Sequence, residues 1–450
     1  MKKPIPPPPI SSFSKEEAAA FSESMTRFFA NPEAPKLVSE AERDHPYWEK
    51  FMRRTKPTGI PPQHLWRLVK KQRGFTSRNI RVAPEEDFRF SYNLTNAMQQ
   101  TLHRLDMHMG GTIGGSTTIP EGTRDQVLVS SLMEEAIASS LLEGAATTRE
   151  LAKQMLRSGR PPRDRSERMV LNNYSTMQGL VRWRNEPMTV DRLLEVHRTV
   201  VSNTLDDPAN EGRVRSNNDV HVVDLYNEVL YVPPDHGRVG KLLEALCAFA
   251  NDTGNEPFIH PVVRGITLHF LIGYIHPFVD GNGRTARALF YWYLLRSGYW
   301  LVEFLAISKI ILRAPAQYGR AYLHTEQDDN DLTYFLDFNL RSLRLAMEDL
   351  DLYLHRKLEE RKGLFEVVRN ASINDRQADL VALWMREPEK ILTIEEVRSR
   401  FGMVYQTART DLMGLEGMGL AVSNKAGKKL RYFRSPEFET NVSNLSRRSI

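Results

Sequence analysis

The segment from His276 to Arg287 has the residue types and spacing of a phosphate-transfer loop. Gly281 and Gly283 flank Asn282 directly before a helix predicted from Arg284 onward, so successive backbone N–H groups can converge on an anion without obstruction by Cβ atoms. The N-terminus of that helix adds about half a positive charge. The segment reads His276-Pro277-Phe278-Val279-Asp280-Gly281-Asn282-Gly283-Arg284-Thr285-Ala286-Arg287.

Four side chains of this segment complement the anion-binding backbone. Arg284 and Arg287 share one face of the predicted helix and can hold neighbouring phosphates. The carboxylate of Asp280 suits Mg²⁺ bound to phosphate oxygens. His276, with an ordinary pKa of about 6.5, can accept a proton near neutral pH. Alone, each feature is usually a turn, a structural histidine or a solvated pair of arginines, but together they predict a phosphoryl- or nucleotidyl-transfer site.

The elements that position this loop are predicted to be mostly helices. Apolar residues recur at three- and four-residue spacing from Asp87 onward, which indicates a mainly α fold. The exception is the segment 210–234, where two β-prone runs predict a hairpin over 219–232, called the flap below. The predicted helices are 92–107, 124–143, 148–157, 166–183, 190–204, 238–251, 261–275, 284–295, 314–325 and 332–367.

The regions outside this helical part differ in character. Residues 1–14 are proline-rich and predict an extended arm, and 15–87 predict a small helical region. After a connecting helix at 351–367, residues 370–435 contain three helical patterns and a basic hairpin, which resemble a winged helix-turn-helix. Residues 436–450 are expected to form a flexible tail.

The loop resembles the signature of the Fic family, His-Pro-Phe-x-Asp/Glu-Gly-Asn-Gly-Arg-x-x-Arg, at every specified position. The resemblance extends over about 88–350 and implies a Fic-type helical bundle with a β-hairpin flap. It includes three segments upstream of the loop and two downstream: Glu195-Val196-His197, Gly212-Arg213-Val214-Arg215, Val232-Pro233-Pro234, Tyr318 and Asp331-Leu332-Thr333.

This resemblance implies protein AMPylation, the transfer of AMP from ATP to a Ser, Thr or Tyr hydroxyl of a target protein. It assigns His276 as the base and Asp280 as the Mg²⁺ ligand. The amides of Gly281–Gly283 and the side chain of Asn282 would stabilise charge on the α-phosphate, while Arg284 and Arg287 would bind the β- and γ-phosphates. Tyr318 would line the adenine side.

A second motif predicts control of this activity. Ser139 and Glu143 are four residues apart near the end of a predicted helix, and Gly144 is a natural helix stop. On the residues alone, Glu143 is a surface carboxylate with a nearby cation. The segment Ser139-x-x-x-Glu143-Gly144 resembles the inhibitory motif of the Fic family, which implies that Glu143 pairs with Arg287 and excludes the γ-phosphate. The same glutamate assists removal of AMP in parts of the family, so a de-AMPylating hydrolase is an alternative.

The resemblance also implies that the flap docks the target. Main-chain pairing along a strand edge would align a hydroxyl while demanding little of the target sequence. Val220, His221 and Val222 are the candidate docking edge; the alternative is an ordinary buried hairpin. His260 and His269 lack a third ligand at metal-like spacing and are interpreted as structural.

Composition narrows the remaining possibilities. The chain has 450 residues and a net charge of +5, and its one cysteine, Cys247, excludes a disulfide framework and a cysteine-based zinc site. No segment is apolar enough to span a bilayer, so a cytoplasmic protein is predicted.

The C-terminal module leaves its own function open. Arg409 and a basic wing are compatible with a DNA-binding regulator whose Fic domain senses nucleotide; target docking or a homodimer through the same module are equally open. The wing residues are Lys428, Lys429, Arg431 and Arg434.

Overall fold

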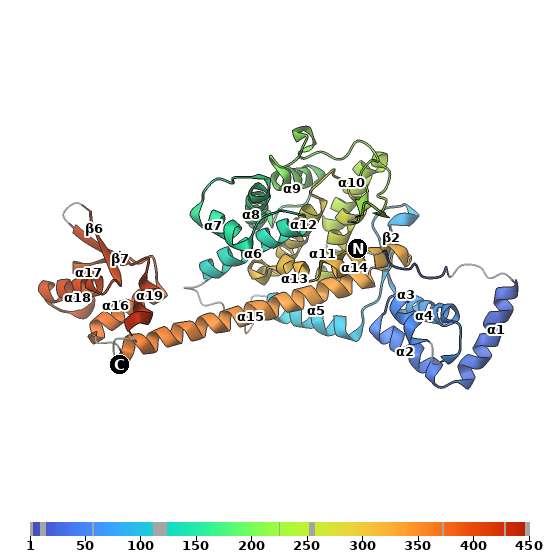
Figure 1. The fold of residues 1–450 in the computed structure, drawn as a ribbon, viewed down its shortest axis with the longest axis horizontal. Helices are drawn as coiled ribbons and strands as arrows, with labels where there is room; N and C mark the ends of the chain where they lie inside the picture. Colours follow the sequence, from blue (N-terminus) through green and yellow to red (C-terminus); the bar gives the residue numbers. More distant parts are fainter. Residues whose placement is uncertain are drawn as a thin grey trace. The chain divides into compact units, whose positions relative to one another are not determined.

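The computed structural model groups the chain into two compact units (Figure 1). Unit 1 comprises Met1–Ser116 and Leu128–Met347, and unit 2 comprises Thr117–Val127 and Glu348–Ile450. The residues that the structure describes are 3–9, 15–55, 58–110, 124–224, 226–251, 257–370, 373–426 and 429–445.

Unit 1 begins with the expected helical region, whose core is aromatic. Trp48, Phe51 and Trp66 pack with ring centroids 5.2 to 6.4 Å apart. Residues 3–9 lie against this region, because the Ile5 N–H donates to Glu49 (2.9 Å) and the Ile5 carbonyl accepts from Tyr47 (3.0 Å). The helices are α1 (Lys15–Ala30), α2 (Glu33–Asp44), α3 (Trp48–Arg54) and α4 (Pro62–Thr76).

A small hairpin follows where the sequence predicted none. Strands β1 (Arg78–Arg81) and β2 (Arg89–Tyr92) pair antiparallel, with η2 (Glu86–Phe88) between them. The helix expected from residue 92 begins instead at Asn96, because the side chain of Thr95 accepts from the Met98 N–H and caps it there.

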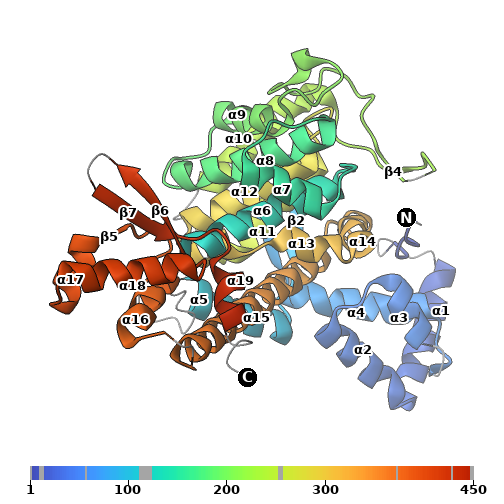
Figure 2. The same cartoon turned by 60° about the vertical axis from the view of Figure 1, so that its left-hand side comes forward.

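The remaining helices of unit 1 surround α11 and α12, which pack closely on each other (Figure 2). Both are buried along almost their whole length. Helix α11 is accordingly apolar on most of its surface, whereas the first turns of α12 bury Arg284 and Arg287. The elements are α5 (Asn96–Met109), α6 (Arg124–Leu142), α7 (Arg149–Ser158), α8 (Arg165–Trp183), α9 (Val190–Val201), η4 (Pro208–Asn210), η5 (His236–Arg238), α10 (Val239–Asn251), α11 (Pro261–Ile275), α12 (Asn282–Arg296), η6 (Trp300–Phe304), α13 (Ile307–Leu312), α14 (Pro315–Gln327) and α15 (Thr333–Asn370).

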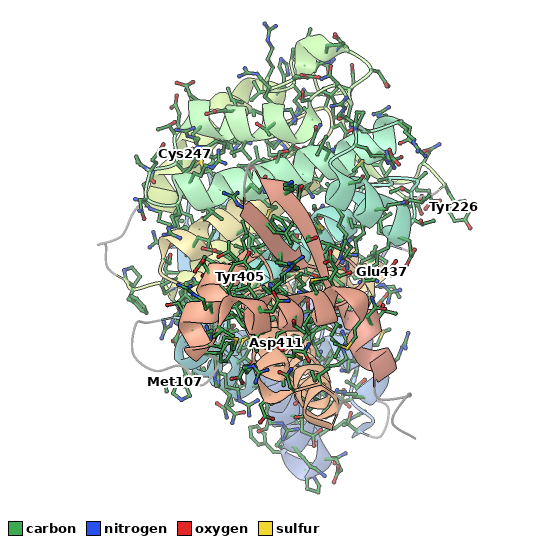
Figure 3. The ribbon with its side chains drawn as sticks, turned by 90° about the vertical axis from the view of Figure 1, so that its left-hand side faces the viewer. Met107, Tyr226, Cys247, Tyr405, Asp411 and Glu437 are labelled. Carbon is green, nitrogen blue, oxygen red and sulfur yellow. The ribbon has the colours of Figure 1, made fainter. Side chains whose placement is uncertain are left out.

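The flap is a hairpin, but a shorter one than predicted. Strand β3 (Val222–Val223) pairs antiparallel with β4 (Val229–Tyr231), and the register shifts between the two residues of β3. Tyr226, near the turn, is 84% exposed and projects outward (Figure 3). The flap is therefore not an ordinary buried hairpin.

Over residues 373–426 and 429–445, unit 2 contains four helices and a three-stranded antiparallel sheet in the order β5-β7-β6. Their shared core includes Leu380, Trp384, Leu412 and Tyr432. The elements are α16 (Asp375–Arg386), β5 (Leu392–Thr393), α17 (Ile394–Phe401), α18 (Tyr405–Gly417), β6 (Ala421–Ala426), β7 (Lys429–Arg434) and α19 (Phe438–Leu445).

The prediction of a flexible tail at 436–450 is wrong for the first part of this segment. Helix α19 occupies Phe438–Leu445, and Phe438 and Val442 are buried in the core of unit 2. Burial of these two side chains on one helix face stabilises a segment too short to be helical alone. Residues 446–450 lie outside the described part of the chain.

Candidate active site

The loop between α11 and α12 is held in one conformation by its own side chains. His276 ends α11 in a left-handed conformation (φ 49°), and Gly281 precedes α12 with φ 83°. The side chain of Asn282 bridges the loop, accepting from the Phe278 N–H (3.0 Å) and donating to its carbonyl (2.8 Å). One N–H of its amide is thus used within the loop, and the role expected of this side chain at the α-phosphate stays a prediction.

His276 is oriented for proton acceptance at one nitrogen. Its Nδ1 lies 3.2 Å from the Gly273 carbonyl, which can only accept, so Nδ1 carries the hydrogen and Nε2 keeps its lone pair. Burial lowers the pKa of His276. The imidazole is therefore neutral at physiological pH and can act as a base through Nε2.

His197 on α9 packs against the loop. Its ring stacks on Phe278, with centroids 3.7 Å apart and planes 5° apart. Nε2 donates to the Asp280 carbonyl (2.9 Å), and Nδ1 accepts from the Gly212 N–H (3.1 Å). Burial lowers the pKa of His197 to about 4, which keeps this tautomer neutral.

Arg215 joins the loop between α11 and α12 to the base of the flap. Its Nε donates to the His276 carbonyl (3.0 Å), and its backbone N–H donates to the Pro277 carbonyl (2.8 Å). The other guanidinium nitrogens donate to the carbonyls of Asn217 and Pro234. This planar fork therefore fixes the loop and the flap relative to each other.

The two arginines of the loop are buried cations with unused donors. Arg284 donates to the Val200 carbonyl (3.2 Å) and lies 3.4 Å from Asp280, but its Nε has no partner. Arg287 is likewise buried, and its NH1 has no partner. Buried donors without partners are costly, so both guanidinium groups are suited to an anion.

Ser139 and Glu143 occupy the remaining donors of Arg287. Arg287 Nε donates to Ser139 Oγ (2.8 Å), and NH2 donates to the Ser139 carbonyl (3.0 Å) and to Glu143 Oε1 (3.0 Å). Burial opposes the charge on Arg287, but the Glu143 carboxylate outweighs it and raises the Arg287 pKa. A Cβ added at Gly283 would overlap the carboxylate of Glu143, so this carboxylate lies directly over the glycine loop.

Tyr318 lies beside this cluster on α14. Its hydroxyl is 2.7 Å from Nε2 of His269, a buried residue whose pKa burial lowers well below its usual value. His269 packs among Phe290, Tyr322 and Phe335, which agrees with a structural role. His260 caps α11 by accepting from the Val262 N–H (3.2 Å).

Asp280 is the carboxylate within the loop itself, directly before Gly281. Its side chain is 42% exposed and lies 3.8 Å from Arg165. The described residues contain no cluster of three or more His, Cys, Asp or Glu side chains that could hold a metal. One exposed carboxylate nevertheless fits Mg²⁺, which proteins usually bind through one or two carboxylates together with substrate phosphates.

The predicted docking residues lie at the start of the flap. Val220 and His221 precede β3, and only Val222 belongs to the strand. His221 and Val223 are exposed. The usable strand edge is therefore shorter than the sequence suggested.

Three supporting residues received no role from the sequence. His197 and Arg215 occur in segments that resemble the family, but nothing local indicates that they contact a loop far along the chain. Glu135 on α6 is 1% exposed and accepts from Tyr291 (2.8 Å) and from the Ser308 N–H (2.7 Å). Its neighbour Glu134 is also acidic, so no signal in the sequence singles out Glu135.

The fold and the loop thus define a mainly helical domain in which two buried arginines with unpartnered donors lie beside a neutral histidine. Residues 187–294 match the family model described as Fic/DOC family. A crystal structure of a Fic family protein from Desulfovibrio desulfuricans has a TM-score of 0.50 at 21% identity, covering 77% of this chain and 98% of that chain. The mainly helical fold is confirmed.

Curated relatives match the same region. A protein named Protein adenylyltransferase Fic from Drosophila yakuba is 35% identical over 169 residues, or 37% of this chain and 30% of the relative. One of the same name from Nematostella vectensis is 35% identical over 116 residues, or 26% of this chain and 25% of the relative. The matches thus span a third or less of these relatives' length. No helix among the described residues is long and apolar enough to cross a membrane.

Proposed function

We propose that this chain is a protein adenylyltransferase that transfers AMP from ATP to a Ser, Thr or Tyr hydroxyl of a target protein. The observation that carries the proposal is the pair of buried arginines with unused donors, Arg284 and Arg287, beside the glycine loop and the neutral His276. The printed names of the relatives agree with this activity.

In the proposed reaction the target hydroxyl oxygen attacks the α-phosphorus of ATP. A bond forms between that oxygen and phosphorus, the bond to the β-phosphate oxygen breaks, and pyrophosphate leaves. The hydroxyl proton passes to Nε2 of His276, while the amides of Gly281–Gly283 stabilise charge on the α-phosphate. Arg284 and Arg287 bind the leaving pyrophosphate. Mg²⁺ held by Asp280 would neutralise phosphate charge.

The contact between Glu143 and Arg287 supports an autoinhibited state. A γ-phosphate at Arg287 would have to displace this carboxylate, which also lies over Gly283. Glu143→Gly removes the competitor and leaves both arginines in place. We therefore expect the variant to transfer AMP faster than the wild type.

Intact-protein mass after incubation with Mg²⁺ and ATP tests both statements, with labelled ATP and cell lysate as a second substrate pool. Glu143→Gly should gain AMP on itself or on a lysate protein, and Glu143→Gly/His276→Ala should gain none. Equal labelling by wild type and Glu143→Gly would refute autoinhibition. Labelling that survives His276→Ala would refute the assigned base, and no labelling of either pool would refute the transferase.

Removal of AMP is a second candidate activity of this site. The Glu143 carboxylate lies over the loop where the α-phosphate would rest, so it could orient a water molecule there. Incubation of an AMP-modified protein with wild type and Glu143→Gly separates the two activities. Loss of AMP only with the wild type would support a hydrolase; no loss with either would exclude it.

A third candidate function concerns unit 2, for which the sequence predicts a winged helix-turn-helix. Asp411 of α18 is buried and binds Arg376 (2.8 Å), and Glu416 accepts from the Ser423 N–H (3.0 Å). Both acidic residues are therefore used internally, which leaves Arg409 as the charged residue on the exposed side of α18. Tyr405 and Asp411 lie on this helix in Figure 3.

A DNA-binding surface on unit 2 would comprise α18 and the wing. Lys425 and Arg431 are exposed on the wing strands. Arg434, which the sequence also placed among the phosphate-binding residues of the wing, instead pairs with Glu439 (2.9 Å). Lys428 lies outside the described residues. Salt-sensitive binding of the whole chain to generic duplex DNA, weakened by Arg409→Ala, would support this function. Absence of binding at low salt would favour protein docking. Self-association and a cytoplasmic location remain predictions of the sequence.

A further inference from the structure

Two rows of side chains meet between α6 and α12. On each helix the residues of the row are four positions apart and therefore share a face. The rows run in opposite directions along the chain. The contacting sets are Glu143 with Gly283 and Arg287, Ser139 with Arg287, and Glu135 with Tyr291.

Glu135 is the most firmly held member of the α6 row. Its Oε2 accepts from the Tyr291 hydroxyl of α12 (2.8 Å) and from the Ser308 N–H of α13 (2.7 Å), and its Oε1 accepts from the Ser308 hydroxyl. The side chain is 1% exposed. One carboxylate thus joins α6 to two other helices.

Glu143 is held far less firmly. It lies one residue beyond the end of α6, before Gly144 with φ 86°, and its side chain is 25% exposed. Its hydrogen bond to Arg287 depends on where α6 ends relative to α12. The position of Glu143 is therefore determined by the residues that anchor α6.

We propose that Glu135 is a positioning residue that holds α6 against α12 and thereby keeps Glu143 on Arg287. This inference rests on the proposed autoinhibition by Glu143. Glu135 acts through hydrogen bonds at its two oxygens, so glutamine, which has the same shape and can accept from Tyr291 and bond to Ser308, preserves most of the effect. Alanine removes all three bonds.

Glu134 provides a matched control. It is the neighbouring carboxylate of α6, but it pairs with Arg149 and with Lys153 (3.0 Å) of α7 instead of α12. Glu134→Ala therefore removes a carboxylate of the same helix without affecting the contacting rows. Ser308→Ala offers a milder change at Glu135, because it deletes one donor and leaves the carboxylate intact.

The first measurement is the rate of AMP incorporation. Glu135→Ala should raise it roughly tenfold, the factor associated with loss of a hydrogen bond to a charged group. Ser308→Ala should raise it less, and Glu135→Gln and Glu134→Ala should stay near the wild type. In the Glu143→Gly background, Glu135→Ala should give no further increase. An equal increase in that background, or activation by Glu134→Ala, would overturn the inference.

Hydrogen exchange at the amides of residues 139–145 tests the positioning role of Glu135 independently of enzymatic activity. Glu135→Ala should increase exchange there, while Glu134→Ala and Glu135→Gln should not. If Glu143→Gly fails to activate the enzyme, the proposed autoinhibition is wrong, but faster exchange in Glu135→Ala would still support the positioning role. Unchanged exchange in folded Glu135→Ala would refute that role.

Discussion

Acidification should destabilise unit 1 through His197. The imidazole stacks on Phe278, and its two nitrogens are committed to one donated and one accepted hydrogen bond. A second proton on Nδ1 would face the Gly212 N–H, placing two donors against each other. Burial lowers the pKa of His197 to about 4, and a protonated ring would in addition have no acceptor for its second proton.

The size of this effect follows from linkage. The unfolded chain, with a histidine pKa of about 6.5, binds more protons than the folded state until the pH falls to about 4, so the free energy of unfolding decreases through this window. Between about pH 7 and about pH 5 the loss from this one group is about 2 kcal/mol, at about 1.36 kcal/mol per pH unit below the unfolded pKa.

Urea unfolding at pH 7 and pH 5, followed by tryptophan fluorescence, measures this loss in the wild type and in His197→Gln. Glutamine can accept from Gly212 and donate to Asp280 but does not titrate. The wild type should lose about 2 kcal/mol more than the variant between the two pH values. All other histidines are present in both proteins and cancel. Equal pH dependence of the two proteins would refute the argument.

Three further substitutions test other contacts. Arg215→Lys removes the planar fork that joins loop and flap, so AMP transfer should slow roughly tenfold while the melting temperature changes little; an unchanged rate would contradict this. Gly281→Ala introduces a Cβ 2.5 Å from Val201 Cγ1 at positive φ, and should lower the free energy of unfolding by about 1–3 kcal/mol in urea titrations. Asp411→Ala should lower the urea midpoint for unfolding of unit 2 without slowing AMP transfer. A slower rate of AMP transfer would contradict this prediction.

The long helices could be predicted from sequence because periodicity and end signals agreed. The helix predicted over 261–275 has those bounds in the structure, since Pro261 occupies its first turn and His276 ends it in a left-handed conformation. The hairpin β1–β2 escaped prediction because its strands have four residues each, too few to show alternation. Helix α19 escaped because its stability comes from burial in unit 2 and not from its own sequence.

The site was predictable where it is contiguous in the chain. The loop residues follow one another in the sequence. The contacts of Ser139 and Glu143 with Arg287 were expected from the resemblance to a family motif and not from the residues alone. The contacts of His197 and Arg215 depend on tertiary packing, which a sequence pattern does not report. The bonding of Asn282 depends on the local curvature of the loop, because only in that conformation does its amide reach both backbone groups of Phe278.

The two hydrogen bonds between the Asn282 side chain and the backbone of Phe278 have an entropic consequence. It closes the chain from Phe278 to Asn282 into a small ring before any anion arrives. A flexible glycine-rich loop would lose backbone freedom on binding, at about 1–2 kcal/mol per ordered residue. Here that freedom is already lost in the folded protein, so the loop is a preformed receptor. The affinity for the proposed phosphate ligand would then depend on the charge of the site and on whether Glu143 occupies Arg287, and not on ordering of the loop.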